Sequence, residues 1–199
     1  MYENLYETIT QNLVDYGYII INDALDTSLV KNLQDLALQN QSYKQAGISN
    51  TTKLHLDDTK RRDKTKWLDE DGSTQSAYLS FTKGLQEYLN SSLYLGLCYY
   101  EAHFALYEEG DFYEKHLDSF KNSKNRVVTT VFYLNEAWKE NDGGELIIYD
   151  KDDTVIAKVM PEANTLVVFL SEDFPHEVLQ AKRKRHSIAG WFRVDKKFV

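Results

Sequence analysis

The segment Arg126–Leu134, R-V-V-T-T-V-F-Y-L, decides the fold class, because β-branched and aromatic residues fill it with no turn residue between them. Runs of the same kind lie on both sides of it, separated by turn-rich breaks. Before it comes Y-E-A-H-F-A-L-Y, and after it come G-E-L-I-I-Y, T-V-I-A-K-V, N-T-L-V-V-F-L, H-E-V-L and H-S-I-A-G-W-F-R-V. Many short strands in succession predict a jelly-roll-type barrel.

The N-terminal half has a different pattern, in which apolar residues recur at helical spacing. Helices are predicted over residues 3–16 and 75–94, and a third lies between them, after a cap that begins at Asp26. A short apolar strand is expected at 18–21. The polar residues 39–53 are expected to form a loop.

Helices followed by strands predict an α+β fold. Its core is expected to be a double-stranded β-helix of the jelly-roll or cupin-like type, with the N-terminal helices packed outside. We expect a single domain over residues 1–199, with a helical part at 1–97 and the jelly-roll core at 98–199. Within the core, Asn164 of P-E-A-N-T is expected to take a left-handed turn conformation.

Composition limits the partners and the compartment. The net charge of −8 makes nucleic acid an unlikely partner, because an acidic surface repels the phosphate backbone. Cys98 is the single cysteine, so no disulfide can form within the chain. The sequence begins without the basic start and apolar core of a signal peptide, and no apolar run reaches the length of a membrane span. A cytoplasmic protein with no membrane partner is expected.

The motif His116-Leu117-Asp118 is the first candidate for chemistry. In an extended strand His116 and Asp118 would project to the same side, which supplies two ligands of a His/carboxylate metal site. Taken alone, the pair is more typical of an exposed polar strand face. A third ligand is available at His176, 58 residues after Asp118, where a strand is expected to begin. A jelly roll brings such strands face to face, and two imidazoles with one carboxylate suit Fe(II) with open positions.

Arg185 is the second candidate. On its expected strand Arg185, Ser187, Ala189 and Trp191 share one face, and an inward guanidinium needs an anionic partner. Thr129, Val131 and Tyr133 alternate onto one face of the Arg126–Leu134 strand and would line the same cavity. A slot with a metal at one end and an arginine at the other suits a small dicarboxylate such as 2-oxoglutarate. The alternative is that Arg185 belongs to a solvated basic surface segment, K-R-K-R, and binds no anion.

Across roughly residues 55–193 the sequence resembles the 2-oxoglutarate/Fe(II)-dependent prolyl hydroxylases, in the branch of the oxygen-sensing enzymes and their bacterial relatives. The H-x-D…H motif falls on His116, Asp118 and His176, and the cosubstrate arginine falls on Arg185. Further matches lie around the expected cavity: Tyr133 in Y-L-N-x-x-W with Gly143-Gly144, Tyr107 at the strand before the metal motif, Leu146 on the cavity wall, and Trp191 in I-x-x-W. The matches on the substrate side are Arg126 at the substrate entrance, and R-x-D-K-x-x-W at Arg61, Asp63, Lys64 and Trp67.

The resemblance implies the roles of these residues. The triad His116, Asp118 and His176 would be catalytic metal ligands. Cosubstrate binding would fall to Arg185, Tyr133, Tyr107, Thr129, Val131, Leu146 and Trp191, and substrate binding to Arg61, Asp63, Trp67 and Arg126, the first three in a mobile covering loop. Two departures are His186, which follows the arginine where relatives carry tyrosine, and Asn164, where glycine is common. His186 should face away from the cavity.

The implied reaction is hydroxylation of a protein side chain, in first place proline, with 2-oxoglutarate decarboxylated to succinate and CO2. Fe(II), 2-oxoglutarate and O2 are the implied cofactors, with ascorbate as an accessory reductant. The implied substrate is a protein or peptide with a proline in a flexible loop, a translation factor being one candidate. The alternatives are a free amino acid or other small molecule, nucleic-acid demethylation, and a cupin-like module that holds metal without turnover. His103 is expected to be a packed or surface residue and not a ligand.

Overall fold

The structure is a computed structural model. It describes residues 2–39, 42–50, 53–55, 57, 59–69, 72–119 and 125–194, with the backbone only at 48–50 and 53–55.

The three predicted helices are present. They are α1 (Glu3–Asp15), α2 (Thr27–Gln39) and α3 (Ser73–Leu93). The expected cap of α2 is confirmed, since the Asp26 carboxylate accepts a hydrogen bond from the Ser28 N–H at 2.9 Å. None of the described helices has the length and apolar character needed to cross a membrane.

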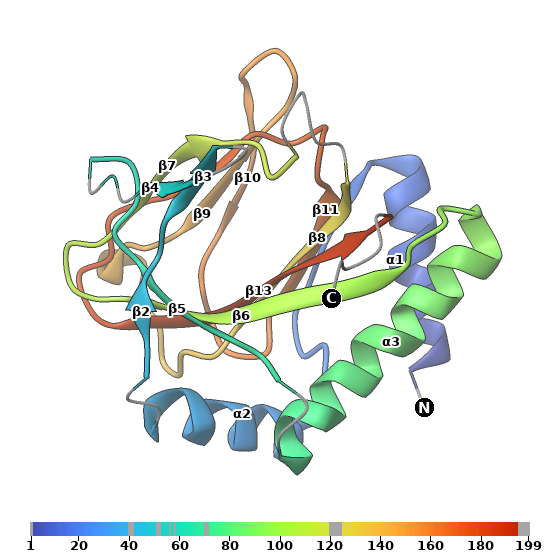
Figure 1. The fold of residues 1–199 in the computed structure, drawn as a ribbon, viewed down its shortest axis with the longest axis horizontal. Coiled ribbons are helices and arrows are strands. Elements are labelled where there is room, and N and C mark those ends of the chain that lie inside the picture. The colour runs from blue at the N-terminus through green and yellow to red at the C-terminus, as the bar shows by residue number, and fades with distance from the viewer. Residues whose placement is uncertain are drawn as a thin grey trace.

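A large antiparallel sheet forms the platform of the molecule. In spatial order its strands are β1 (Tyr18–Ile21), β11 (Leu166–Leu170), β8 (Arg126–Tyr133), β13 (Arg185–Arg193), β6 (Tyr99–Tyr107), β5 (Lys64–Trp67) and β2 (Lys44–Gln45). The long central strands β6 and β13 run side by side across Figure 1. The segment that decided the fold class, β8, therefore lies inside this sheet and not at its edge.

A smaller sheet faces the large one. Its order is β10 (Val155–Val159), β9 (Leu146–Tyr149), β12 (His176–Val178) and β7 (Tyr113–His116). A separate hairpin pairs β3 (Ile48–Asn50) with β4 (Lys53–His55), and one turn of 3-10 helix spans Glu140–Asp142. Two facing antiparallel sheets with helices outside confirm the predicted α+β fold with a double-stranded β-helix core.

The loop expected at 39–53 was wrong in part, because β2 and β3 lie inside it. In the same way β5 forms within the charged segment that the resemblance placed in a covering loop. These short strands lie at the outer end of the large sheet or in a separate hairpin, where backbone pairing does not require an apolar face. Their polar composition therefore concealed them.

Each face of the large sheet has its own core. Helix residues such as Leu33 and Leu85 pack against outward-facing strand residues such as Phe132 and Ile188. Tyr133 and Ile148 belong to the second core, which lies between the two sheets. In Figure 1 the helices lie below and to the right of the large sheet, away from the small sheet. Because neighbouring residues point to opposite faces, β8 and β13 serve both cores.

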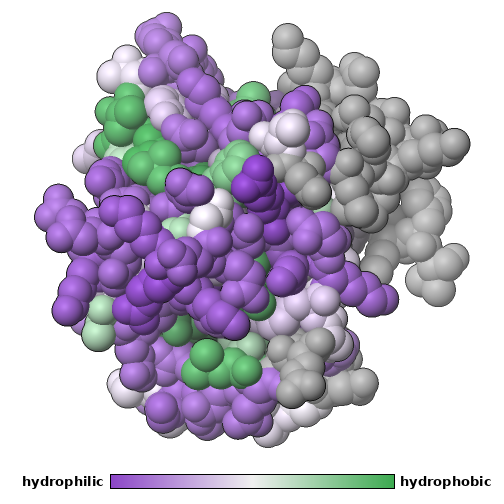
Figure 2. All heavy atoms as spheres, turned by 90° about the vertical axis from the view of Figure 1, so that its left-hand side faces the viewer, coloured by the Kyte–Doolittle hydropathy of each residue, from purple (hydrophilic) through white to green (hydrophobic). Residues whose placement is uncertain are grey.

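Asn164 has the predicted left-handed backbone, with φ of 65°. Its side-chain amide also joins the two halves of the chain, since it accepts from the Leu25 N–H at 2.8 Å and donates to the Leu25 carbonyl at 2.9 Å. The face of the molecule that carries β2 and β7 is mostly hydrophilic, with small hydrophobic areas between the polar side chains (Figure 2).

Candidate active site

A pocket opens between the two sheets. Its walls come from strands of both sheets and from the segment before β5. The lining residues are Arg61, Asp63, His103, Ala105, Tyr107, Tyr113, His116, Asp118, Arg126, Thr129, Val131, Leu146, His176, Val178, Arg185, Ser187, Ala189 and Trp191. The four residues predicted to share one face of β13 all line it, and most of the other predicted site residues do as well.

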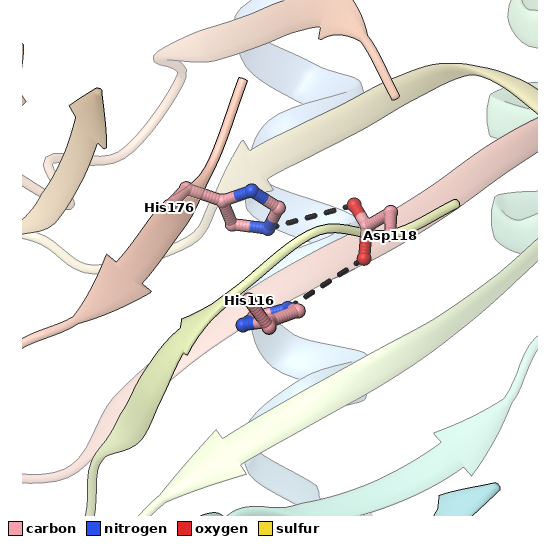
Figure 3. Close-up of side chains that lie close together, drawn as sticks. All are labelled: His116, Asp118 and His176. Carbon is pink, nitrogen blue, oxygen red and sulfur yellow. Dashed lines mark ion pairs between the residues drawn. The ribbon is translucent and has the colours of Figure 1, made fainter. Parts of the chain in front are cut away.

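The predicted triad converges in this pocket. One ligand atom from each of His116, Asp118 and His176 lies within 4.8 Å of the other two. The two histidines are direct partners in the antiparallel pairing of β7 with β12. Figure 3 shows both imidazoles directed at the Asp118 carboxylate, with Nε2–oxygen distances of 3.6 Å for His116 and 3.5 Å for His176.

The orientation of both imidazoles is fixed from behind. His116 Nδ1 lies 2.8 Å from the Glu114 carbonyl oxygen, and His176 Nδ1 lies 3.0 Å from the Phe174 carbonyl oxygen. A carbonyl oxygen can only accept, so each Nδ1 carries the proton and each Nε2 presents a lone pair. Both Nε2 atoms are therefore prepared to bind a metal at the same point.

The charge states of the triad residues also suit metal binding. Burial lowers the pKa of His176 to about 4, so this imidazole is neutral at physiological pH. Burial raises the pKa of Asp118, but the attraction of its carboxylate for a proton held by His176 or His116 outweighs burial and holds that pKa well below its usual range, so Asp118 stays ionised. Two neutral imidazoles and one carboxylate are the ligand set of the non-haem Fe(II) oxygenases.

The sequence had suggested that Asp118 lies in an extended strand, but the structure places it outside any strand. The strand β7 ends at His116, and Asp118 follows in a bend. Its carboxylate is held in position by Thr129 on β8, whose hydroxyl donates to Asp118 Oδ2 at 2.9 Å. The Thr129 oxygen also lies 2.8 Å from the Ser171 hydroxyl, which is left to act as donor to it. A hydrogen-bond relay thus replaces the strand as the support of this ligand.

Arg185 lines the pocket and is 1% exposed. Its Nε donates to the Gly144 carbonyl at 2.8 Å, and its Nη1 lies 3.4 Å from the Ser187 hydroxyl. The rings of Tyr107 and Tyr133 flank the guanidinium at 4.7 and 5.0 Å from ring centroid to Cζ. These partners are neutral, so the buried positive charge favours an anionic ligand entering from the pocket.

Unpaired polar atoms gather around this site. Within the described residues, Tyr133 Oη, Trp191 Nε1 and His103 Nδ1 are buried without a hydrogen-bond partner. Tyr133 is not part of the pocket lining but lies directly behind it, against Arg185. Burial raises the pKa of its hydroxyl to about 12, so it remains a donor. A carboxylate beside Arg185 would satisfy it, which fits the distal carboxylate of 2-oxoglutarate.

Three of the four predicted substrate residues, Arg61, Asp63 and Arg126, line the pocket. Arg61 forms a two-point ion pair with the fully buried Asp63, through Nε at 2.5 Å and Nη2 at 2.8 Å. Arg126 stacks on the Trp191 ring at 3.7 Å from its centroid and donates to Glu101 at 3.0 Å.

Trp67, by contrast, does not line the pocket. It is 54% exposed and stands beside it, at the outer end of β5.

Three further residues belong to the site and were not predicted. Tyr113 stacks on His116, with ring centroids 3.7 Å apart and planes 19° from parallel. Ser171 supports Thr129, and His103 lines the pocket, where the expectation of a packed or surface histidine had given it no role. Ser171 and His103 reach the site through contacts between distant segments, whereas Tyr113 lies three residues before His116 on β7. His186 faces away from the pocket, as predicted, and lies beside Tyr43.

Comparisons with known proteins agree with this geometry. The family model of the 2OG-Fe(II) oxygenase superfamily matches residues 102–193. A solved prolyl-4-hydroxylase of Pseudomonas putida is 35% identical, with a TM-score of 0.87 over 96% of this chain and 100% of that chain. A prolyl hydroxylase of Trichoplax adhaerens, solved in complex with a hypoxia-inducible factor peptide, is 28% identical, with a TM-score of 0.82 over 96% of this chain and 90% of that chain.

A curated relative shares a shorter segment. The hypoxia-inducible factor prolyl hydroxylase of Caenorhabditis elegans is 36% identical over 85 residues, which make up 42% of this chain and 12% of that protein. The match therefore spans about an eighth of that relative's length.

A jelly-roll fold that holds two histidines, an aspartate and a buried arginine in one pocket defines an iron- and 2-oxoglutarate-dependent oxygenase. The chain belongs to the 2-oxoglutarate/Fe(II) oxygenase superfamily, and it resembles solved prolyl hydroxylases over nearly its full length.

Proposed function

We propose that this protein hydroxylates a proline in a protein or peptide substrate, using Fe(II), O2 and 2-oxoglutarate. One oxygen atom of O2 enters the new hydroxyl group and the other enters succinate, while 2-oxoglutarate loses CO2. The observation that carries the proposal is the joint presence of the His116–Asp118–His176 cluster and the buried Arg185 in one pocket. Likeness to the Pseudomonas putida prolyl-4-hydroxylase over the whole chain favours proline as the target.

Fe(II), once bound by the three ligands, would supply the activation of O2. The protein's own part is to orient and to exclude water. Arg185 and Tyr133 would hold the distal carboxylate of 2-oxoglutarate, and the Gly144 carbonyl fixes the arginine in place. Thr129 fixes the carboxylate ligand. Leu146 and Val131 provide apolar walls that keep water from the reacting atoms.

The open side of the pocket suits a peptide. Arg126 is stacked on Trp191, and Trp67 stands exposed at the rim, so an incoming chain would meet flat aromatic surfaces before it reached the metal ligands. Aromatic rings bury a pyrrolidine ring well and need no charge on the target residue. The Trichoplax relative was solved with a peptide, which supports a substrate of the same kind here.

The proposal is tested by incubating the purified protein with cell lysate, Fe(II) and 2-oxoglutarate, and searching the proteome for prolines that gain one oxygen. We expect at least one such proline, absent when His116→Ala replaces the wild type, with succinate formed in step. Oxygen gain on free amino acids or on nucleic acid, with no modified protein, would contradict the proposal. Absence of any succinate would favour a metal-binding module without turnover.

Two finer points are part of the proposal. We place the protein in the cytoplasm, where the exposed thiol of Cys98 would remain reduced. We also expect ascorbate to prolong activity by reducing iron that has been oxidised without substrate turnover. Progress curves with and without ascorbate check the second point, and fractionation of the source cells checks the first.

A further inference from the structure

A histidine outside the metal cluster lines the same pocket. His103 lies on β6 and is 4% exposed, and its Nδ1 has no hydrogen-bond partner in the part of the chain that the structure describes. A buried polar atom left unpaired costs about 1–3 kcal/mol, so folded proteins nearly always provide a partner. No described residue forms a hydrogen bond with the side chain of His103, and the imidazole lines the pocket, so its polar partner is expected to be a molecule that enters the pocket.

Strand register places His103 toward the rim. On β13, Arg185 pairs with Tyr107 and Ala189 pairs with His103. Four residues along a strand span about 13 Å, so His103 lies well away from the backbone position of the arginine that would anchor the cosubstrate. On its other side His103 pairs with the exposed Trp67 of β5. A molecule that enters the pocket beside the exposed Trp67 therefore meets His103.

Two tryptophans hold the imidazole between them. The ring of Trp67 meets it edge-on with centroids 5.2 Å apart, and the ring of Trp191 lies 5.3 Å away on the pocket side. Trp191 Nε1 is also buried without a partner among the described residues. The rings of Trp67, His103 and Trp191 thus form a mostly apolar wall, and buried within it are two polar nitrogens without a partner among the described residues.

The charge state of His103 limits what it can bind. Burial, together with Arg61, lowers its pKa to about 3, so the imidazole is neutral and has one N–H donor and one acceptor nitrogen. A carboxylate or phosphate would be better served by the arginines nearby. A secondary amide has one N–H and one carbonyl, so it matches a neutral imidazole in either tautomer. The apolar wall and the single polar position together fit a peptide main chain.

We propose that His103 is a substrate-binding residue that forms a hydrogen bond with a main-chain amide of the peptide next to the target proline. Trp67 and Trp191 hold the imidazole in the orientation that this bond requires. The inference rests on the proposed prolyl hydroxylase function and adds the residue that would set the peptide's depth in the pocket.

The test uses the full-length protein with iron, and a synthetic peptide around the proline identified in the lysate experiment. His103→Met removes the hydrogen bond and keeps a side chain of similar size, and His103→Gln restores a donor and an acceptor. The matched control is His186→Met, because His186 is also buried with an unpaired Nδ1 among the described residues but lies outside the pocket.

For His103→Met we expect the KM for the peptide to rise about tenfold, which corresponds to about 1.4 kcal/mol. The KM for 2-oxoglutarate and the absorption band of the Fe(II)·2-oxoglutarate complex should not change. His103→Gln should recover most of the loss, and His186→Met should leave the peptide KM unaltered.

Three results would overturn the inference: an unchanged peptide KM in His103→Met, an equal loss in His186→Met, or a loss of 2-oxoglutarate affinity in His103→Met. If the wild type modifies no protein proline, the proposed function fails and this inference fails with it. If the wild type hydroxylates the peptide and His103→Met has the same KM for it, this inference fails and the proposed function stands.

Discussion

Arg185 is a buried cation whose surroundings favour an anionic ligand. Its guanidinium is almost fully buried and its hydrogen bonds go to neutral groups, the Gly144 carbonyl and the Ser187 hydroxyl. For Arg185→Gln we expect the KM for 2-oxoglutarate to rise 10- to 100-fold, because a charge-assisted hydrogen bond contributes about 1.5–3 kcal/mol. Titration of the Fe(II)·2-oxoglutarate absorption band measures this directly.

The control for this variant is metal affinity in the absence of cosubstrate, which should remain near that of the wild type. Arg185 is not a member of the metal cluster, and on β13 it lies six residues before Trp191, the strand partner of the Thr129 that supports Asp118. Loss of metal binding in Arg185→Gln would mean that the arginine supports the ligands and not the cosubstrate.

Thr129 has a role that its sequence position did not suggest. It was predicted to line the cosubstrate slot, and it does line the pocket, but its hydroxyl donates to the metal-binding carboxylate of Asp118. For Thr129→Val, which keeps the shape and removes the donor, we expect metal affinity to fall 10- to 100-fold. Calorimetric titration with Mn(II) or Fe(II) provides the measurement.

The neighbouring residue is a matched control. Thr130 is equally buried on the same strand but points to the opposite face, where its hydroxyl lies 2.8 Å from the Tyr100 hydroxyl. Thr130→Val should lower stability and leave metal affinity nearly unchanged. If both variants lose metal to the same extent, the strand as a whole is responsible and not the bond to Asp118.

At the scale of elements, the side chain of Tyr100 on β6 packs directly over a glycine of β13. A Cβ at Gly190 would lie 2.1 Å from the Tyr100 hydroxyl, which is hydrogen-bonded to Thr130. For Gly190→Ala we expect a loss of about 1–3 kcal/mol in the free energy of unfolding, because the tyrosine must leave its position. Urea unfolding measures the loss.

A double-mutant cycle isolates the cause. Tyr100→Ala removes the side-chain atoms Oη, Cζ and Cε2, which would lie 2.1, 2.4 and 2.8 Å from the new methyl carbon, so Gly190→Ala should cost less in that background than in the wild type. Equal costs in the two backgrounds would show that the glycine is needed for backbone conformation and not for space.

The elements also show what sequence could and could not predict. The core strands were predictable because apolar and β-branched residues fill them, and the triad because metal chemistry admits few residue types. In contrast, β2 and β5 are polar, and their pairing is set by neighbouring strands and not by their own composition.

The same limit applies to the site. Tyr113 was missed because a register irregularity in β7 lets it stack on His116 three residues later, whereas a regular strand would turn the two side chains to opposite faces. His103 was missed because it meets Trp67 only through cross-strand pairing. No local pattern in the sequence encodes such contacts between distant segments. Asp118 was found although its expected strand geometry was wrong, since the ligand type and spacing were sufficient.

At the scale of the whole molecule, buried histidine makes stability depend on pH. The pKa of His103 is lowered by burial to about 3, whereas a histidine in an unfolded chain titrates near about 6.5. Between these values the unfolded chain binds a proton that the folded chain does not. Above about pH 6.5 His103 is neutral in both states and does not affect the free energy of unfolding. As the pH falls from about 6.5 toward 3, that free energy decreases.

We expect the unfolding free energy of metal-free His103→Met to depend less on pH than that of the wild type. The difference in slope should approach about 1.4 kcal/mol per pH unit below about pH 6. Urea unfolding at several pH values checks this. Parallel pH profiles for the two proteins would show that His103 is protonated in the folded state.

The direct pairing of His116 with His176 has a consequence for the rigidity of the small sheet. Its outermost strand, β7, ends at one of these residues, and the other lies 60 positions later on the adjoining strand β12. A metal ion that joins both imidazoles acts as a reversible crosslink that closes this long loop. Fraying of the sheet's outer edge, and with it the rigidity of one pocket wall, is then governed by how much iron the surroundings supply.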